Sequence, residues 1–513
     1  MVADGNPRPG ANWAGCTETH VSAVYFLGDK VLKVKKPVRN DFLDFSTIEA
    51  RHRACLDEVR LNRRLSPDIY LGVAEIDLGD CCVEPAVVMR RLDDRDGLAV
   101  LLGREPDRVR CAVEEVVLKV AALHTATPPA VGDTSPGSWR RVIAQWRKEW
   151  AALERLNPAF SPDQRRGAAY QLGLRYMNGR RLLFDRRVRD GRIRDGHGDL
   201  RVDHVYVTSS GVRIVDCLEF DADLRACDVV ADFAFLAMDL ERLDEPAVAD
   251  QLWAVYRDHT GDDYPSSLAH FYVAQRALVR LKVVLMSPRP RTRAAVAEED
   301  RLLDLAEAHL VAAQPTMTCI GGLPGSGKST LASALAVRHD LVYLSTDAIR
   351  HEGRESDERS PWGAGRYTES AVAAVYAELL SRARTALGSG YSVVLDASWR
   401  DSAHRRQAAA IAEEAGAILS EIACEVDDVT AAERLRGSRP GFSEAGMAER
   451  RAMRAGFAPW PTATVVSTTG DASESLDKAA ALLRSTTQAT LEGAQLCKVA
   501  ATDPAAASQV DDD

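Results

Sequence analysis

Hydrophobic and polar positions alternate with a period of two near the start of the chain and then change to a helical period. Residues 21–27 and 31–36 are rich in β-branched and aromatic side chains, and the Gly28-Asp29-Lys30 segment between them is typical of a hairpin turn. The segment Ser46-Thr-Ile-Glu49 has the spacing of a capping box and predicts a helix that ends near Leu65. We therefore expect a hairpin followed by a helix.

The next part of the chain is predicted to be mainly helical. Residues 87–92 favour one more strand, and from 105 to about 189 the apolar positions recur at helical spacing. One helix carries a stripe of large apolar side chains, namely Trp139, Ile143, Trp146, Trp150 and Leu153. Core packing is the simplest interpretation of this stripe, and an aromatic wall of a substrate pocket is the alternative. His124 is interpreted as a hydrogen-bonded structural histidine.

The pattern changes again in the second half of the chain. The segment Ser287-Pro-Arg-Pro-Arg291 breaks the periodicity, and residues 293–313 predict a charged helix. Short apolar runs follow at residues 317–320, 341–344 and 392–395, and they alternate with helices that begin near Ser329 and Glu369. This alternation predicts an α/β domain with a parallel sheet.

A glycine-rich loop joins the first of these runs to the helix after it. Its sequence fits G-x-x-x-x-G-K-S, in which glycines let the backbone curl around a triphosphate, the lysine contacts the β- and γ-phosphates and the serine hydroxyl binds Mg²⁺. The predicted nucleotide-binding residues of this loop are Gly322, Leu323, Pro324, Gly325, Ser326, Gly327, Lys328, Ser329 and Thr330. We therefore predict an ATP site with Ser329 as a ligand of Mg²⁺.

Composition narrows the class of protein. The chain has 513 residues, 46% of them hydrophobic and 27% charged, which is typical of a globular protein with two domains. No apolar run of 18 residues and no signal peptide are recognised, so a cytoplasmic location without membrane partners is expected. Ten scattered cysteines form no C-x-x-C pair, and a formal net charge of −10 argues against a nucleic-acid partner.

A strand lysine and a helix glutamate in the first half of the chain have the arrangement of a pair that holds phosphates. Alternation in the second predicted strand places Lys33 and Lys35 on one face, and Glu58 lies in the helix that follows. In kinase N-lobes a strand lysine and a helix glutamate hold the α- and β-phosphates. Taken alone, however, these residues also fit an ordinary solvated surface.

A more specific cluster follows between residues 197 and 232. The segment His197-Gly-Asp-Leu-Arg-Val-Asp-His204 is followed by Val212-Arg-Ile-Val-Asp216 and Asp228-Val-Val-Ala-Asp232. Phosphoryl transfer to an alcohol needs one carboxylate that orients or deprotonates the hydroxyl and another that holds Mg²⁺. The alternative is that His197 and Asp199 only form a structural hydrogen-bonded loop.

The order and spacing of these segments resemble the aminoglycoside phosphotransferase group of the protein-kinase-like fold, whose catalytic loop is H-G-D-x-x-x-x-N. The resemblance covers roughly residues 17 to 310. It implies that His197 and Asp199 are catalytic, with Asp199 as the base, and that Asp216 binds metal. It also implies that Lys33, paired with Glu58, binds the phosphates of ATP.

Several positions depart from that family pattern. His204 stands where the family has a metal-binding asparagine, so it is a candidate metal ligand of a softer kind. Glu219 and Asp221 are alternatives to Asp216 as the metal aspartate, although Asp216 is preferred because it follows an apolar strand. The expected nucleotide loop, residues 17–22, contains no glycine, and no acidic pattern for an aminoglycoside is present. We therefore expect a kinase for another small molecule.

Three clusters accompany the glycine-rich loop. Asp347 and Arg350 are one helical turn apart after an apolar strand, and Asp396 ends the apolar run Val393-Val-Leu. Arg434 and Arg439 belong to a basic segment before a helical run at 443–456 and are candidate lid residues that contact ATP. Solvated surface charge is the alternative for each cluster.

Residues 316–485 resemble P-loop kinases related to polynucleotide kinase, chloramphenicol phosphotransferase and zeta-type toxins. The resemblance implies that Asp347 is a second catalytic base, that Arg350 contacts phosphate or acceptor, and that Asp396 orders Mg²⁺. The whole chain resembles a bacterial fusion family that joins such a domain to a phosphotransferase-like kinase.

These observations predict two domains, a bilobal α+β protein-kinase-like domain and an α/β P-loop domain. We place the first at residues 17–313 and the second at 316–488, and we expect residues 1–16 and 491–513 to be disordered. The predicted function is ATP-dependent, Mg²⁺-dependent phosphoryl transfer to a hydroxyl of a small molecule. Alternatively, the P-loop domain is a nucleotide-gated regulator or a nucleic-acid 5′-hydroxyl kinase. The acceptors and the oligomeric state stay open.

Overall fold

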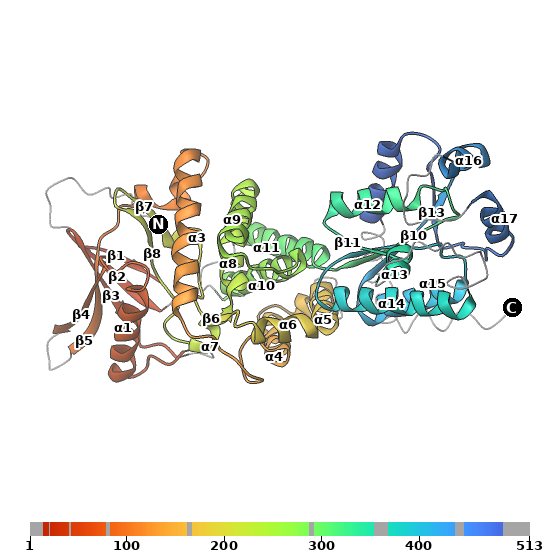
Figure 1. Cartoon of the computed structure of the whole chain (residues 1–513). Helices are drawn as coiled ribbons and strands as arrows, with labels where there is room; N and C mark the ends of the chain where they lie inside the picture. The colour runs from red at the N-terminus through yellow and green to blue at the C-terminus, as the bar shows by residue number, and fades with distance from the viewer. Residues whose placement is uncertain are drawn as a thin grey trace, which may run out of the picture. The chain divides into compact units, whose positions relative to one another are not determined.

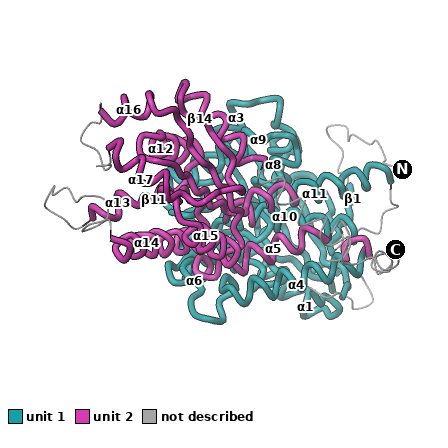
Figure 2. Tube along the Cα trace, turned by 90° about the vertical axis from the view of Figure 1, so that its right-hand side faces the viewer, with its two compact units in different colours: residues 1–156, 185–264, 272–306 teal, residues 157–184, 265–271, 307–513 magenta. Residues whose placement is uncertain are grey.

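The computed structural model describes most of the chain (Figure 1). The described residues are 14–19, 21–39, 43–77, 83–161, 167–286, 292–352, 368–436 and 446–485. The chain forms two compact units (Figure 2). Unit 1 comprises residues 1–156, 185–264 and 272–306, and unit 2 comprises residues 157–184, 265–271 and 307–513.

Unit 1 opens with an antiparallel sheet in the order β1-β2-β3-β5-β4. Its strands are β1 (Ala14–Glu18), β2 (Ser22–Leu27), β3 (Lys30–Lys35), β4 (Tyr70–Asp77) and β5 (Val83–Arg90). The predicted hairpin at 21–36 is confirmed by the pairing of β2 with β3. Residues 14–16, which were expected to be disordered, belong instead to β1 because that strand pairs with β2 along its length, from Ala14 opposite Leu27 to Glu18 opposite Ala23.

The helix after the hairpin, α1 (Ile48–Asn62), packs against this sheet. Its N-cap is Thr47, whose hydroxyl accepts a hydrogen bond from the backbone N–H of Ala50, so the helix begins one residue later than the predicted box implies. Cys55 and Val59 on its inner face pack on Val87 of the sheet. This packing fixes which helical face, and therefore which side of Glu58, points toward the strands.

The rest of unit 1 is mainly helical, with two short hairpins. Its helices are α2 (Leu98–Leu101), α3 (Pro106–Ala126), α4 (Trp139–Leu156), α7 (Ala222–Arg225), α8 (Val229–Arg242), α9 (Pro246–Thr260), most of α10 (Ser266–Leu285) and of α11 (Arg293–Ala312), and the end of α6 (Arg181–Arg189). The hairpins pair β6 (Ile193–Asp195) with β9 (Ala226–Asp228) and β7 (Val205–Thr208) with β8 (Gly211–Ile214). Helix α4 buries Trp146 and Trp150, as expected for a core stripe.

Unit 2 is built on a five-stranded parallel sheet in the order β11-β12-β10-β13-β14. The strands are β10 (Thr316–Gly321), β11 (Val342–Ser345), β12 (Val393–Asp396), β13 (Ile418–Glu425) and β14 (Thr464–Ser467). The helices are α5 (Ala168–Gly179), α12 (Lys328–His339), α13 (Thr346–His351), α14 (Glu369–Gly388), α15 (Ser402–Glu414), α16 (Asp428–Arg436) and α17 (Met447–Ala455). The predicted parallel sheet is confirmed.

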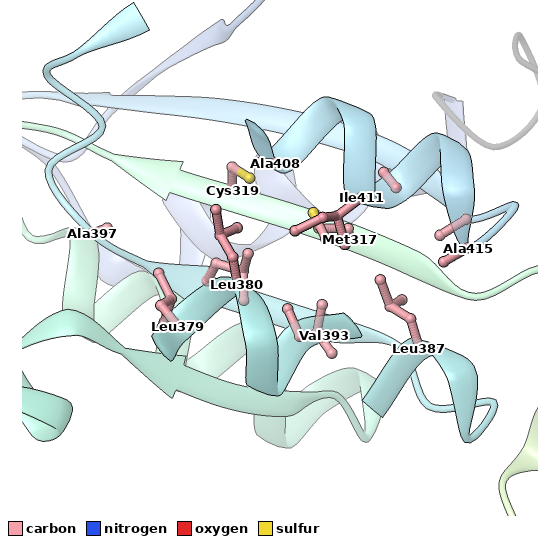
Figure 3. Close-up of a cluster of buried hydrophobic side chains, with 14 of the residues drawn as sticks. Met317, Cys319, Leu379, Leu380, Leu387, Val393, Ala397, Ala408, Ile411 and Ala415 are labelled. Carbon is pink, nitrogen blue, oxygen red and sulfur yellow. The ribbon is translucent and has the colours of Figure 1, made fainter. Parts of the chain in front are cut away.

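Hydrophobic side chains cover both faces of the parallel sheet, which explains why its central strands are continuous apolar runs. On one face, Met317 and Cys319 of β10 pack against Leu380 of α14 and Ile411 of α15 (Figure 3). On the other face, Leu335 of α12 belongs to a second buried cluster. Two packed faces hold the carboxyl ends of the strands, and the loops after them, in a fixed arrangement.

Among the described residues, no helix combines the length and the apolar character that crossing a membrane requires.

Candidate active sites

The glycine-rich loop leaves the carboxyl end of β10, the central strand of the parallel sheet. Gly322, Gly325 and Gly327 have φ angles of 149°, 78° and 77°, a region that side-chain-bearing residues rarely adopt. A Cβ on Gly322 would lie 2.5 Å from Ser326 Oγ and 2.7 Å from the Cys424 carbonyl oxygen. The loop is therefore curled so tightly that its backbone forms a cradle for an anion.

Lys328 stands at the first turn of α12, directly after the cradle. In the described part of the chain no carboxylate forms an ion pair with its ammonium, although the lysine is partly buried. An ammonium without a partner beside a backbone anion cradle and a helix N-terminus fits a phosphate ligand. The adjacent hydroxyl of Ser329 is exposed.

Asp396 lies next to this loop because β12 pairs with β10, which places Asp396 opposite Ile320. Its carboxylate is 2% exposed, and Oδ2 accepts a 2.7 Å hydrogen bond from the Tyr343 hydroxyl. Oδ1 is buried and has no hydrogen-bond partner among the described residues. Burial and the Asp396 charge raise the pKa of Tyr343. Tyr343 was not recognised from sequence, because its contact joins residues of two strands that are 53 positions apart.

Two arginines hold the carbonyl groups of the loop from the side of α16 and α17. Arg434 donates to the Thr468 carbonyl at 2.6 Å and, more weakly, to the Gly325 carbonyl at 3.5 Å. Arg450, which is 3% exposed, donates to the Pro324 carbonyl at 2.7 Å. These bonds support the loop from outside, and Arg450 had no sequence signal because it lies in an ordinary charged helix. Arg439 lies outside the described residues.

Asp347 and Arg350 lie one turn apart on α13, a helix whose N-cap Ser345 receives the Asp347 N–H. Their side chains form an ion pair and are 20% and 12% exposed. From the sequence, both side chains were expected to face a phosphate, whereas in the structure the arginine pairs with the carboxylate. In this state Asp347 is held in place at the end of β11, on the same edge of the sheet as Asp396.

In unit 1, Lys33 and Lys35 both point from β3 to Glu58 of α1. Glu58 is fully buried, with Oε1 2.9 Å from Lys33 Nζ and Oε2 2.5 Å from Lys35 Nζ. Lys33 also pairs with Asp216, and Lys35 with Glu219. Burial raises the pKa of Glu58, but the charges of the two lysines outweigh this effect and hold it below its usual value. Sequence alternation had placed Lys35 on this face without giving it a role.

Asp216 follows the β7–β8 hairpin and has a φ angle of 64°, which is uncommon for a residue with a side chain. The Tyr70 hydroxyl oxygen accepts its backbone N–H at 3.0 Å, and its Oδ2 lies 3.5 Å from His204 Nε2. Burial raises the pKa of Asp216, but Lys33 and His204 outweigh burial and keep it well below its usual range. Asp216 is therefore an anion held at a strained turn.

The two alternatives to Asp216 are engaged elsewhere. Glu219 pairs with the buried Lys35, and burial raises its pKa. Asp221 caps α7, where its Oδ1 accepts the backbone N–H groups of Asp223 and Leu224. Of these three carboxylates, Asp216 is the one that pairs with Lys33.

Asp199 lies in the loop between β6 and β7, with its side chain 27% exposed. Arg201 Nε is 3.1 Å from its Oδ1, and His204 Nδ1 is 2.8 Å from its carbonyl oxygen and 3.7 Å from its Oδ2. His204 is thus within 4 Å of the carboxylates of both Asp199 and Asp216. Arg201, which sequence reasoning had not singled out, is the cation next to Asp199.

His197 does not reach the surface of the loop. It is fully buried, its Nε2 bonds to the Val215 carbonyl at 3.0 Å, and its Nδ1 accepts the Asp199 N–H at 3.3 Å. Burial lowers the pKa of His197 to about 4, although the Asp232 charge opposes the shift. The imidazole is therefore neutral near pH 7, and its Nδ1 holds the backbone N–H of Asp199.

Asp232 of α8 holds the same loop through hydrogen bonds to its backbone. Its two carboxylate oxygens accept the backbone N–H groups of His197 at 2.7 Å and Gly198 at 2.8 Å. His124 of α3 contributes its Nε2 at 3.0 Å from Oδ2, so the interpretation of His124 as a hydrogen-bonded residue is confirmed. Burial raises the pKa of Asp232, but the His124 hydrogen bond and nearby charges outweigh it and hold it well below its usual range.

The expected nucleotide loop at residues 17–22 lies between β1 and β2, and residue 20 is outside the described residues. Thr17 and Glu18 end β1, and the N–H of Thr19 donates to the Ser22 carbonyl at 2.8 Å. The Ser22 N–H donates to Thr19 Oγ1 at 2.9 Å. A hydroxyl and backbone groups therefore link the ends of the two strands.

In unit 2 the residues present fit a triphosphate with Mg²⁺. A bound triphosphate and its ion would engage the curled cradle, the Lys328 ammonium and Asp396 Oδ1, and neither of the last two has a partner among the described residues. Among the described residues no group of three or more His, Cys, Asp and Glu side chains would hold a metal by themselves. Mg²⁺ suits such sites because it takes one or two carboxylates and completes its shell with phosphate and water.

Comparison with known proteins defines the class. Residues 22–271 match the family model of the phosphotransferase enzyme family, and residues 317–460 match that of an AAA domain. The chain is a kinase-type protein in which a protein-kinase-like phosphotransferase domain precedes a nucleotide-binding P-loop domain. The resemblances drawn from residues 197–232 and from the glycine-rich loop are thereby confirmed.

The chain belongs to the same family as curated proteins that match it over nearly its whole length. It is 35% identical over 492 residues to the uncharacterized protein Rv2004c of Mycobacterium tuberculosis, and the match covers 94% of this chain and 98% of that protein. The uncharacterized protein Mb2027c of Mycobacterium bovis matches with the same identity and coverage, 35%, 94% and 98%.

Solved structures resemble the two halves separately. A complex of the aminoglycoside phosphotransferase APH(2")-IIIa with GDP and kanamycin is 16% identical, with a TM-score of 0.37, and covers 57% of this chain and 91% of that one. A putative kinase from Chloroflexus aurantiacus is 23% identical, with a TM-score of 0.28, and covers 33% of this chain and 98% of that one.

Proposed function

We propose that unit 1 transfers the γ-phosphate of ATP to a hydroxyl group of a small molecule. The observation that carries the proposal is the position of His204, whose ring lies within 4 Å of the carboxylates of Asp199 and Asp216. The candidate base Asp199 and the candidate metal ligand Asp216 thus both lie close to His204. Lys33 contacts Asp216. Phosphoryl transfer to an alcohol needs these groups together.

In this proposal each residue of unit 1 has a distinct task. Asp199 accepts the proton of the acceptor hydroxyl, and Arg201 holds its carboxylate in place. Lys33, kept in position by Glu58, binds phosphate oxygens. Asp216, with His204 beside it, would hold Mg²⁺, which neutralises phosphate charge when bound.

His197 and Asp232 act as positioning residues in the same proposal. His197 fixes the Asp199 N–H, and Asp232 fixes the two N–H groups before it. Because the three bonds involve buried partners, the loop keeps its shape when substrate is absent. Preorganisation of the base in this way reduces the free energy needed to reach the reactive geometry.

The test is a search for products in a metabolite extract incubated with the full chain and labelled ATP. We expect Asp199→Asn to lower transfer by about 10²–10⁴-fold while ATP stays bound, because a general base contributes about that much. Asp223→Asn is the matched control, since Asp223 is exposed and pairs only with Arg141 on the surface. A product formed equally well by the Asp199→Asn protein would overturn the assignment.

We also propose that unit 2 binds a second ATP and acts as a kinase with Asp347 as its base. Support comes from the shared sheet edge, where Asp347 follows β11 and Asp396 ends the neighbouring strand β12. Lys328 would bind the β- and γ-phosphates, and Ser329 and Asp396 would hold Mg²⁺. Arg434 would stabilise the phosphate loop, to whose Gly325 carbonyl it donates.

Nucleotide binding by unit 2 is tested with a fluorescent ATP analogue. Lys328→Ala should weaken binding to unit 2 about tenfold or more, because the phosphates lose a point charge in a partly buried site. Lys478→Ala, at an exposed lysine, is the matched control. Equal binding by the two variants would contradict the proposed role of the cradle.

A further inference from the structure

Unit 1 contains a cavity of about 630 Å³ beneath the catalytic loop. Its walls come from the end of α3, the turn before β6, the start of α8 and the end of α9. This volume lies within the range of about 300–1,000 Å³ that small-molecule pockets have. Asp199, Asp216 and Lys33 are not among its lining residues, so the cavity is distinct from the proposed phosphate site.

Two arginines and one aspartate line the cavity. Arg192 precedes β6 and Arg194 lies in it, whereas Asp190 is the acid that lines the same space, and His259 comes from α9. Arg192 has a weak pairing at 3.3 Å with Asp262 and is 36% exposed. The excess of cationic groups over carboxylates at the wall favours an anionic ligand.

Arg194 and His259 have unused capacity to bind such a ligand. Arg194 donates to the carbonyl oxygens of Gly191 at 2.7 Å and Thr127 at 2.5 Å, and none of the described carboxylates pairs with it. His259 is exposed, and within the described ranges its ring takes part in no hydrogen bond. Because its partners are uncharged carbonyl groups, the positive charge of the Arg194 guanidinium is not offset by a paired carboxylate among the described residues.

The cavity wall also contains the histidine that supports the catalytic loop. His124 is 4% exposed, its Nε2 binds Asp232, and its Nδ1 is buried without a hydrogen-bond partner in the described part of the chain. Asp232 in turn holds the N–H groups of His197 and Gly198. A change at the wall therefore reaches the backbone next to Asp199 through two contacts.

We propose that this cavity binds a small molecule that carries a phosphate or carboxylate group, and that its occupancy stabilises the catalytic loop through His124 and Asp232. Arg192, Arg194 and His259 contact the anionic group, while Ala121 and Val229 contact the apolar part of the ligand. The coupling rests on the proposed role of Asp199, whereas the binding site itself does not.

Inorganic phosphate is the probe, titrated calorimetrically into the full chain with Lys328→Ala, which removes the phosphate loop as a competing site. Ala122 is exposed at the cavity wall, so Ala122→Glu adds a negative charge without removing a contact, and Ala122→Gln is its neutral match. We expect Ala122→Glu to bind phosphate about tenfold more weakly than Ala122→Gln. Equal affinity of the two variants would overturn the site.

Hydrogen exchange at His197 and Gly198 tests the coupling. Phosphate should slow exchange at these amides several-fold in the Ala122→Gln protein, and have less effect in the Ala122→Glu protein. Phosphate binding without slower amide exchange would refute the coupling to the loop but would leave the proposed binding site standing. Neither the phosphate titration nor the hydrogen-exchange measurement depends on catalysis. A negative result in both would therefore overturn the cavity proposal, whereas failure of the proposed phosphoryl transfer is tested separately with Asp199→Asn.

Discussion

Glu58 is a fully buried carboxylate of unit 1 that lies between two lysines. The substitution Glu58→Gln keeps the shape of the side chain but leaves Lys33 and Lys35 without the carboxylate that lies between them. Removing one partner of a buried ion pair costs about 3–5 kcal/mol. Because the lysines keep Asp216 and Glu219, we expect the lower end, about 3 kcal/mol.

Differential scanning calorimetry of the full chain measures this loss. A destabilisation of about 3 kcal/mol should lower the melting temperature of unit 1 by roughly 6–12 °C, while the transition of unit 2 stays in place. Glu75→Gln is the matched control, since Glu75 is exposed on β4 and the same substitution there should change stability by less than about 0.5 kcal/mol.

The pH dependence gives the sign of the effect. Glu58 has a pKa below its usual value in the folded protein, so its contribution is present above the pKa of the unfolded chain, about 4.3, and is lost as pH falls through the folded value. The difference in stability between the wild-type protein and Glu58→Gln should therefore become smaller below about pH 4. A Glu58→Gln protein that melts within about 1 °C of the Glu75→Gln control at pH 7 would refute the reasoning.

Three further predictions concern unit 2. Gly322→Ala should reduce ATP binding about tenfold or more, since its Cβ would meet Ser326 Oγ at 2.5 Å and the Cys424 carbonyl at 2.7 Å; equilibrium binding of an ATP analogue measures this. Asp347→Asn should abolish any product that depends on unit 2 and leave nucleotide binding within about threefold, whereas a regulator would lose only coupling; product analysis with labelled ATP separates the two. Arg450→Met should lower the melting temperature of unit 2 by several degrees, because the Pro324 carbonyl loses a buried charged donor, and calorimetry tests it.

The two proposed sites differ in the residues that hold their loops in place. In unit 1 the loop that carries the proposed base Asp199 is held by Asp232 and His197, both fully buried. In unit 2 the phosphate loop is supported by Arg434 of α16 and Arg450 of α17. Binding of ATP to unit 2 is therefore expected to act on α16 and α17, whereas buried contacts in unit 1 hold the proposed base before ATP binds.

Local patterns were enough to predict the parts of this protein whose chemistry is contained in one short segment. The glycine-rich loop is an example, because the φ angles of Gly322, Gly325 and Gly327 follow from spacing that only glycine permits. Three of the five strands in unit 2 and the helices that begin near Ser329 and Glu369 were equally predictable, since apolar runs alternate there with helical segments, whereas β13 and β14 were not predicted. The start of α1 was misplaced by one residue because Ser46 and Thr47 are equivalent as caps in sequence.

Choices among similar side chains needed the tertiary structure. Sequence left Asp216, Glu219 and Asp221 open as metal ligands, and only the fold shows that Lys35 engages the second and α7 the third. Contacts such as Tyr343 with Asp396, or His124 with Asp232, join residues 53 and 108 positions apart. The energy of such contacts depends on burial and on distances across the fold, so local spacing determined the phosphate loop, while three-dimensional packing decided which partner each carboxylate has.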